Sequence, residues 1–345
     1  MTYPPGKLPP HILRGLLSKF TPIHAESGVI FPPTLGQDTG IVQFGEHQFV
    51  VKTNPVTFAT DEIGYYAVII NANDISTAGA IPKWFTITIL LPEKETTDAL
   101  CEQIFGSIAE ECSKRKIAVV AGHTEVTVGL DRPIVAGTML GILPNGKSPI
   151  TTFGGKPGDT LLLIKDVAIE GTAIIARECE EVLLQKGISK EKIDEGKTYL
   201  HSPGISIVSE AELLTENFPV HALHGPTEGG FTMGLVELAE NSKCGAIIDR
   251  SIIHIPELTH KFCNIYNINP LQLIASGCLI AAVDPHDASA IVKLFQENNT
   301  NIQIIGNLTQ FQGKYEFREK NGPTTPIPYS HIDEITKIFK SQDRI

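Results

Sequence analysis

The sequence has little positive charge. Its 345 residues include 28 Lys and Arg against 39 Asp and Glu, which gives a formal net charge of -11. An acidic chain is a poor match for nucleic acid or for an anionic membrane surface, so we expect neither as a partner. An acidic protein that binds a nucleotide needs local cation density, and Mg²⁺ supplies it readily.

Signals for export, membrane insertion and metal–thiolate chemistry are also missing. No apolar run approaches the ~20 residues of a membrane helix, and Met1–Pro5 does not begin a charged and then apolar leader. The 6 cysteines form no C-x-x-C pair, so we expect mostly buried thiols in a reducing compartment. These absences predict a cytoplasmic, globular protein, and the 42% apolar content is enough for a large core.

Proline and glycine divide the chain into parts. Residues 1–34 are rich in both and are expected to form an arm. The stretch from Pro144 to Gly158 holds three Pro and four Gly, which predicts a linker. After it the alternation of strands and helices begins again. We therefore expect two α/β domains, 35–150 and 156–345.

Hydrophobic periodicity gives the expected elements of each domain. The first domain is expected to have strands at 40–44, 48–53, 85–91, 117–121 and 134–143, and helices at 61–78 and 97–116. The second is expected to have strands at 160–164, 246–248, 279–283, 302–305 and 315–318, with helices at 171–184, from Ser202-Pro203 onward, and at 230–241.

The expected helix 61–78 carries unusual polar residues. Asp61 is a plausible N-cap and Gly79 a plausible C-cap. Asn71 and Asp74 are three residues apart, so they share a helical face. Buried polar groups must be paired, and this face is therefore a candidate for holding a metal ion or a polyphosphate. Hydrogen bonds between helices would explain the same residues.

Two further polar groups lie near the predicted strands 40–44 and 48–53. Asp38 lies in a loop flanked by Gly36 and Gly40, where the backbone can approach a phosphate and the carboxylate can bind Mg²⁺. Thr53-Asn54 closes a strand, a common place for ligand contacts. An ordinary turn would account for either one.

Gly122-His123-Thr124-Glu125 follows the apolar segment 117–121, which is expected to be a short buried strand. His123 could contact phosphate or carry a proton. Glu125 could bind a metal or act as a base. A structural role for a single histidine at a strand end remains an alternative.

A glycine-rich loop, Gly225 to Gly230, precedes the helix expected at 230–241. It is no Walker loop, because the Gly-Lys-Ser/Thr ending is missing. Free N–H groups at a helix N-terminus attract anions, although a turn in which Thr227 caps the helix would also explain the loop. His201, His221 and His224 lie nearby without the spacing of a zinc site.

These motifs, in this order, resemble one superfamily. They are an Asp in a glycine-flanked loop, a Thr-Asn/Asp strand end, Asn-Asp-(x)4-Gly-Ala-x-Pro, Gly-x-Thr after a strand, and Pro-Thr-x-Gly-Gly before a helix. The chain is similar to the AIR synthase (PurM-like) superfamily from about Leu35 to Gly313, and within it to the HypE hydrogenase maturation family. Lys156-Pro157-Gly158-Asp159-Thr160 resembles the usual entry into the second domain.

The resemblance implies a two-domain PurM-like fold with a C-terminal α/β sandwich. The N-terminal domains would pair into a homodimeric β-barrel, with ATP and Mg²⁺ in the cleft at that interface. The chemistry would be phosphoryl transfer from ATP to an amide or carbonyl oxygen. By motif, Asp38, Asn54 and Asp74 would hold phosphates and Mg²⁺, with Asp38 and Asp74 as metal ligands. The nucleotide would be lined by Asn71, Gly122, His123 and Thr124. The second domain would face the site with Thr227, Glu228, Gly229 and Gly230. Proton transfer would fall to His123 or Glu125.

The sequence also departs from the HypE pattern. Asn54 and His123 replace carboxylates, Gly225 replaces the usual Asp before Pro-Thr, and Ala275-Ser276-Gly277-Cys278 replaces Asn-Glu-Gly-Lys. The expected C-terminal cysteine does not follow Cys278. We therefore weigh three hypotheses: an ATP-dependent enzyme acting on an unknown acceptor, a non-catalytic nucleotide-binding partner in metallocofactor maturation, and a kinase for another small metabolite.

Overall fold

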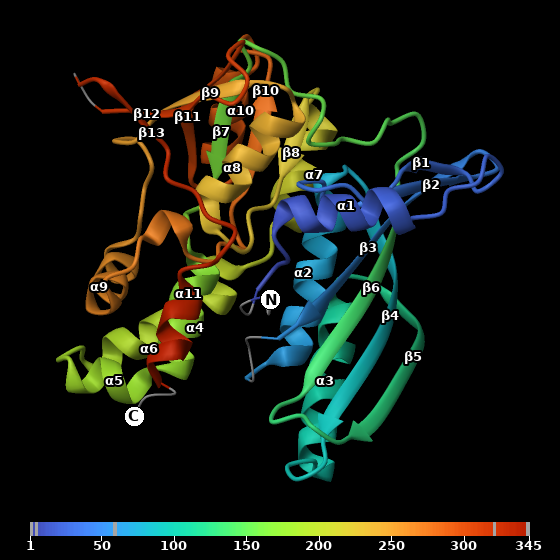
Figure 1. Ribbon diagram of the computed structural model, residues 1–345, viewed down its shortest axis with the longest axis vertical. Coiled ribbons are helices and arrows are strands. Elements are labelled where there is room, and N and C mark those ends of the chain that lie inside the picture. The colour runs from blue at the N-terminus through green and yellow to red at the C-terminus, as the bar shows by residue number, and fades with distance from the viewer. Residues whose placement is uncertain (1–2, 4–5, 58–60, 320–321, 343–345) are drawn as a thin grey trace. The chain divides into compact units, whose positions relative to one another are not determined.

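The computed structural model describes the chain except residues 1–2, 4–5, 58–60, 320–321 and 343–345 (Figure 1). Its contacts divide it into two compact units. The N-terminal unit comprises Ile23–Pro32 and Asp38–Pro149, and the C-terminal unit comprises Met1–Pro22, Pro33–Gln37 and Ile150–Ile345. Within the described residues, no helix is both long and apolar enough to cross a membrane.

The N-terminal unit is a six-stranded sheet with the order β1-β2-β3-β6-β4-β5 and two helices. All neighbouring strands are antiparallel except β4 and β5, which are parallel. The strands are β1 (Val29–Phe31), β2 (Gly40–Phe44), β3 (His47–Val56), β4 (Ile81–Pro92), β5 (Ala118–Thr127) and β6 (Ile134–Ile142); the helices are α2 (Ile63–Thr77) and α3 (Asp98–Lys114).

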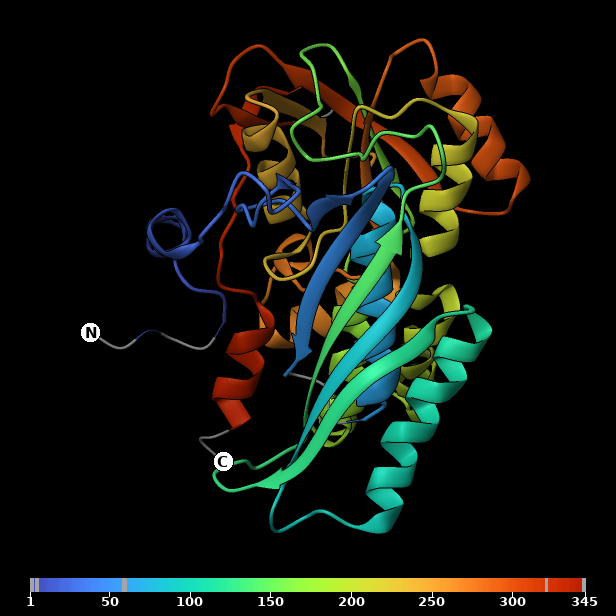
Figure 2. The same cartoon turned by 90° about the vertical axis from the view of Figure 1, so that its right-hand side faces the viewer.

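One face of this sheet packs on α2. Along β6, every second residue from Val135 to Gly141 is buried and the residues between them are half-buried, which is the period of a sheet with one covered face. α2 contacts β3, β4 and β6, and α3 packs in turn on α2. Figure 2 looks onto the face of the sheet that points away from α2. The backbones of the two helices approach closely at Gly64, where a Cβ would lie 2.7 Å from the Ile104 carbonyl oxygen.

Three details of the expected elements were wrong here. α2 begins at Ile63 after Glu62, whose φ is 54°, so Asp61 does not cap it. Asn54 lies inside β3, which continues to Val56, rather than at its end. β5 is an exposed edge strand that continues to Thr127, rather than a short buried strand that ends before Gly122. An edge strand has a neighbour on one side only, so an apolar run there need not be buried.

The C-terminal unit contains a seven-stranded sheet with the order β13-β12-β9-β11-β7-β10-β8. Its strands are β7 (Thr160–Ile164), β8 (Ala222–His224), β9 (Gly245–Asp249), β10 (Leu279–Val283), β11 (Ile302–Thr309), β12 (Tyr315–Arg318) and β13 (Thr324–Pro326). Its helices are α1 (Pro10–Phe20), α4 (Ile169–Glu178), α5 (Glu180–Gln185), α6 (Lys190–Thr198), α7 (Val208–Asn217), α8 (Gly230–Asn241), α9 (Glu257–Tyr266), α10 (Ala288–Glu297) and α11 (Ile335–Gln342), with short turns η1 (Leu200–Gly204) and η2 (Pro270–Gln272).

Both faces of this sheet are covered. All five residues of β7 are buried, and they alternate between two cores. Leu161 and Leu163 pack with Phe231 of α8, whereas Leu162 and Ile164 pack with residues of α7 and α10, including Phe295. A strand that is buried on both faces reads as a continuous apolar run, which explains why β7 and β10 were predicted with their observed bounds.

Two helix predictions in this unit were wrong. The expected helix 171–184 is two helices, α4 and α5, which are separated at Cys179. Ser202-Pro203 does not open a helix but lies within the turn η1, and α7 begins only at Val208. The expectation of mixed α/β architecture is confirmed by the two sheets and their helices.

Candidate functional site

The buried carboxylate of Asp74 is the centre of a polar cluster in the N-terminal unit. Its Oδ2 accepts a hydrogen bond from Asn54 Nδ2 at 2.7 Å and forms an ion pair with Lys52 Nζ at 2.9 Å. The side chain of Asp74 is 5% exposed and that of Lys52 is 23% exposed. Lys52 and Asn54 are two apart on β3, so both point to the face covered by α2.

The electrostatics of Asp74 reflect competing effects. Burial raises the pKa of its carboxyl, the Lys52 ammonium lowers it, and the nearby carboxylate of Asp38 raises it. The hydrogen bond from Asn54 lowers it further. The structure thus brings together Asp38, Asn54 and Asp74, three residues that the sequence placed in one site.

Asn71 lies one turn earlier on α2 and is completely buried. Its Nδ2 donates to the Ala67 carbonyl oxygen at 2.8 Å and lies 3.5 Å from the Asn54 carbonyl oxygen. These two acceptors require the amide nitrogen on that side. Its Oδ1 is therefore the other atom, and it has no hydrogen-bond partner. A buried, unpaired acceptor one helical turn before Asp74 is a position where a ligand hydroxyl or a water could donate a hydrogen bond.

Gly137 of β6 makes room for Asn71. A Cβ on Gly137 would lie 2.9 Å from Asn71 Nδ2 and 2.4 Å from two ring atoms of Phe85. No side chain fits at these distances without displacing its neighbours. The Asn71 amide therefore reaches the sheet only because β6 carries glycine opposite Asn54.

The structure does not bring His123 and Glu125 to this cluster within the unit. Asn54, Gly137, Ile87 and Gly122 form one cross-strand row, whereas His123 belongs to the next row, with Thr88 and Ala136. Successive residues alternate faces, so His123 and Glu125 point to the side of the sheet away from α2. Gly122 and Thr124 share the face of Asn54, but β5 is three strand spacings from β3, about 14 Å.

His123 and Glu125 do lie next to each other on β5. Their Nε2 and Oε2 atoms are 3.1 Å apart, and the side chains are 65% and 49% exposed. β5 also exposes apolar side chains, including Val120 at 55% and Val126 at 55%. A strand edge with both apolar and ionisable side chains exposed has the composition of a contact surface.

The glycine-rich loop lies in the C-terminal unit, at the N-terminus of α8. Gly229, with φ of 84°, is the N-cap, so Thr227 is not the cap. The amide of Gly229 donates to Asp333 Oδ2 at 2.6 Å. Asp333 Oδ1 accepts from Ile274 N at 3.2 Å and from Ile335 N at 2.8 Å. The anion position expected at this helix N-terminus is thus filled by a carboxylate of the chain itself.

Three ionisable neighbours of this loop, Lys7, Glu170 and Asp333, were not predicted from the sequence. Lys7 from the N-terminal arm pairs with Glu228 at 2.9 Å and donates to Thr227 at 3.3 Å. Burial alone would raise the pKa of Glu228, but the Lys7 ammonium and the hydrogen bonds bring it down to about 2. Burial raises the pKa of Glu170, whose Oε2 accepts from Ser276 N at 3.1 Å, to about 7. It raises the pKa of Asp333 likewise to about 7.

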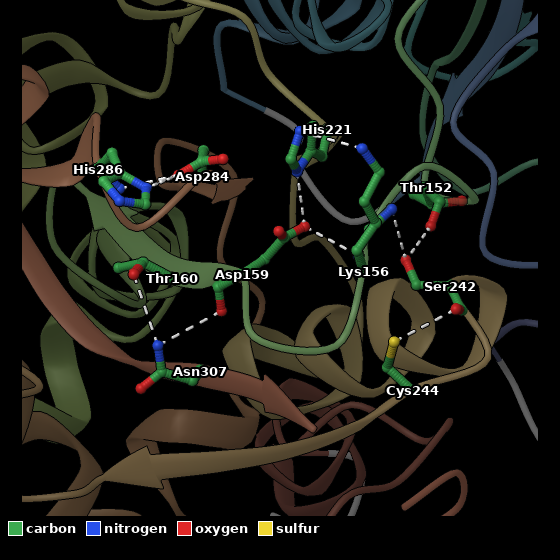
Figure 3. Close-up of polar contacts among 11 residues, drawn as sticks. Thr152, Lys156, Asp159, Thr160, His221, Ser242, Cys244, Asp284, His286 and Asn307 are labelled. Atoms are coloured by element: carbon green, nitrogen blue, oxygen red, sulfur yellow. Dashed lines mark hydrogen bonds and ion pairs between the residues drawn. The ribbon is translucent and has the colours of Figure 1, made fainter. Parts of the chain in front are cut away.

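A second polar cluster fixes the start of β7 (Figure 3). Asp159 Oδ2 accepts from the backbone N–H of Lys156 at 2.8 Å and lies 2.9 Å from His221 Nδ1. His221 Nε2 is 3.4 Å from Lys156 Nζ. An ammonium only donates, so Nε2 is the acceptor and Nδ1 carries the proton. His224 is held separately by Glu237 at 3.0 Å. Among the residues that the structure describes, no three His, Cys, Asp or Glu side chains are grouped as metal ligands.

The fold and the Asp74 cluster define a class, the two-domain α/β proteins in which a buried helix with a few polar residues packs on the N-terminal sheet. The family comparison agrees. Residues 36–143 match the N-terminal domain of AIR synthase related protein, and residues 156–316 match its C-terminal domain. These matches cover more than half of the chain, which therefore belongs to the AIR synthase related protein family.

Individual relatives are more distant. A proposed hydrogenase expression/formation protein of Methanocaldococcus jannaschii is 27% identical over 88% of this chain and 89% of that protein. The carbamoyl dehydratase HypE of Rhodobacter capsulatus is 26% identical over 68% of this chain, but only 66% of its own length is covered.

Solved structures of HypE share the fold. A HypE chain from a HypE–HypF complex superposes with a TM-score of 0.72 at 19% identity, over 92% of this chain and 99% of that chain. HypE in complex with ATP gives a TM-score of 0.69 at 19% identity, over 84% of this chain and 87% of that chain. The sequence-based assignment to this family and fold is thus confirmed.

Proposed function

We propose that this chain binds ATP at the Asp74 cluster and transfers a phosphoryl group to an amide or carbonyl oxygen of an acceptor. The observation that carries the proposal is the polar cluster of Asp38, Asn54, Asn71 and Asp74, in which the buried Asn71 Oδ1 has no partner. The relative that is a carbamoyl dehydratase and the fold shared with an ATP complex support the same chemistry.

The donor set suits Mg²⁺ carried by a nucleotide. Mg²⁺ is commonly held by one or two carboxylates together with phosphate oxygens, and Asp38 and Asp74 provide two carboxylates near each other. These residues would hold the ion, which would neutralise charge on the phosphates during transfer. Asn54 and Asn71 would orient the nucleotide.

A binding experiment tests this site. We expect Asp74→Asn, which keeps the shape, and Asp74→Ala to weaken Mg-ATP binding at least about tenfold, since hydrogen bonds to charged groups contribute about 1.5–3 kcal/mol. The matched control is Ser76→Ala on the same helix, which removes the buried bond from Ser76 Oγ to the Ala72 carbonyl oxygen at 2.9 Å. Parental affinity in both Asp74 variants, measured by calorimetry, would show that the site is elsewhere.

We also propose that two copies pair through β5 and that His123 and Glu125 act on the partner's nucleotide. This proposal accounts for two polar side chains that point away from the Asp74 cluster of their own unit, and for the exposed valines on the same edge. Light scattering should show a dimer for the parent chain and a monomer for Val120→Lys. A dimeric Val120→Lys, or a monomeric parent, would contradict the pairing.

A non-catalytic role in metallocofactor maturation is the second candidate. The observation that favours it concerns the Asp74 carboxylate, which is already paired with Lys52 and Asn54. A carboxylate with these partners is less available as a ligand for the Mg²⁺ that phosphoryl transfer would need. Tight ATP binding without ADP formation, tested over amide and carbamoyl acceptors, would support this role. Single-turnover ADP formation with an identified acceptor would exclude it.

A further inference from the structure

The elements of the Asp74 cluster contain almost no positive charge. From Asp38 to Thr77, which spans β2, β3 and α2, Lys52 is the only Lys or Arg. A nucleotide polyphosphate that approaches this region meets the carboxylates of Asp38 and Asp74. Since like charges repel strongly in a partly buried site, Lys52 is the one Lys or Arg with which this segment can offset the repulsion.

Lys52 is placed to meet a ligand as well as Asp74. Its Nζ lies 2.9 Å from Asp74 Oδ2, and its side chain is more exposed than that of Asp74, 23% against 5%. The ammonium therefore lies between the buried carboxylate and solvent. An ammonium has three N–H donors and binds phosphate as a compact point charge, so it can contact a carboxylate and a phosphate oxygen together.

Asn54, the neighbour of Lys52 on the same face, also donates to Asp74. Asn54 Nδ2 donates to the same Asp74 oxygen at 2.7 Å. Asp74 Oδ2 therefore keeps a hydrogen-bond donor when the ammonium turns toward a ligand.

We propose that Lys52 is a phosphate-binding residue, whose ammonium contacts the polyphosphate directly and replaces part of the divalent cation charge at this site. The inference rests on the proposed nucleotide site at Asp74. It predicts that affinity increases with the number of phosphates even without Mg²⁺, and that this increase depends on Lys52.

The test compares adenosine, AMP, ADP and ATP by calorimetry, in excess EDTA and in Mg²⁺. For the parent chain we expect affinity in EDTA to rise from adenosine to ATP. In Lys52→Met the ratio of ATP to adenosine affinity should fall at least about tenfold, the usual scale for one charge-assisted contact, with adenosine affinity retained. Lys52→Arg should keep most of the ratio, and Lys83→Met, an exposed lysine on β4, should leave it unchanged.

The outcomes separate the two ideas. If Lys52→Met binds all four ligands as the parent does, in EDTA and in Mg²⁺, Lys52 only neutralises Asp74 and the inference is wrong while the nucleotide site stands. If the parent binds none of the four, the proposed function and the inference fall together. Loss of adenosine binding in Lys52→Met alone, with Lys52→Arg losing the ATP preference, would also overturn the inference.

Discussion

Replacing Asn54 by Asp tests whether the negative charge of Asp74 is stabilised by the donors of Asn54 and Lys52. Asn54 Nδ2 is 2.7 Å from Asp74 Oδ2, so Asn54→Asp removes a charge-assisted hydrogen bond of about 1.5–3 kcal/mol. It also sets two carboxylates against each other. At an effective dielectric of about 20, two like charges about 4 Å apart repel by about 4 kcal/mol, and Lys52 offsets part of this. We expect a loss of about 3–6 kcal/mol, a large share of a typical domain's stability.

A divalent cation should reverse much of this loss. With two facing carboxylates and Asp38 nearby, the variant gains a hard-cation site. At a Mg²⁺ concentration about 100 times its dissociation constant, binding would return about 2.7 kcal/mol. The assay is thermal unfolding with and without Mg²⁺. The variant should melt lower than the parent in EDTA and recover several degrees in Mg²⁺.

The pH and a control variant sharpen the result. Repulsion raises the pKa of the paired carboxyls, so the native variant holds a proton that its unfolded chain releases, and its deficit should grow as the pH rises. Asn54→Ala loses the hydrogen bond without adding charge, so it should melt lower without rescue by Mg²⁺. Equal melting of Asn54→Asp and the parent in EDTA, or equal Mg²⁺ rescue of Asn54→Ala, would refute the reasoning.

Two other predictions follow from particular contacts. Gly137→Ala should destabilise the N-terminal unit by about 1–3 kcal/mol in chemical denaturation, because its Cβ would lie 2.4 Å from Phe85 ring atoms. A neutral effect would contradict the close packing. Gly106→Ala on α3, where nothing lies within 4 Å of the added Cβ, is the control for an added methyl and should not destabilise the unit. Glu170→Gln should flatten the pH dependence of melting. Burial raises the pKa of Glu170 to about 7 from 4.5, so its proton stabilises the native state at low pH, and this contribution, up to about 3 kcal/mol, is lost as the pH rises through that interval. An unchanged slope between about pH 5 and pH 8 would show that Glu170 titrates normally.

Much of the fold was visible in the sequence. The central strands β7 and β10 were predicted with their bounds because a strand buried on both faces is apolar at every position. Edge strands and breaks within helices were harder to predict. β5 looks like a buried strand in sequence, yet it lies at the sheet edge with its side chains exposed, since a local apolar run does not reveal how many neighbours a strand will have.

The convergence of polar side chains around Asp74 was predictable where it depends on local spacing. Asn71 and Asp74 on one helix, and Asp38 and Asn54 from the motif order, do converge. Lys52 was overlooked, although its position two residues before Asn54 on a strand places it on the same face. Asp333 could not be found from local patterns, because it reaches Gly229 across 104 residues of sequence. Such pairings depend on tertiary packing alone.

The carboxylate of Asp333 at the N-terminus of α8 has a thermodynamic consequence. A phosphate or carboxylate that needs the Gly229 amide must first displace Asp333. Its observed affinity is then the intrinsic one multiplied by the fraction of molecules in which the segment before α11 has detached. The same linkage works in reverse, because a bound anion must loosen that segment. Occupancy of the glycine-rich loop would therefore be measurable far from the ligand, as faster amide exchange at Ile335 and in the first turn of α11.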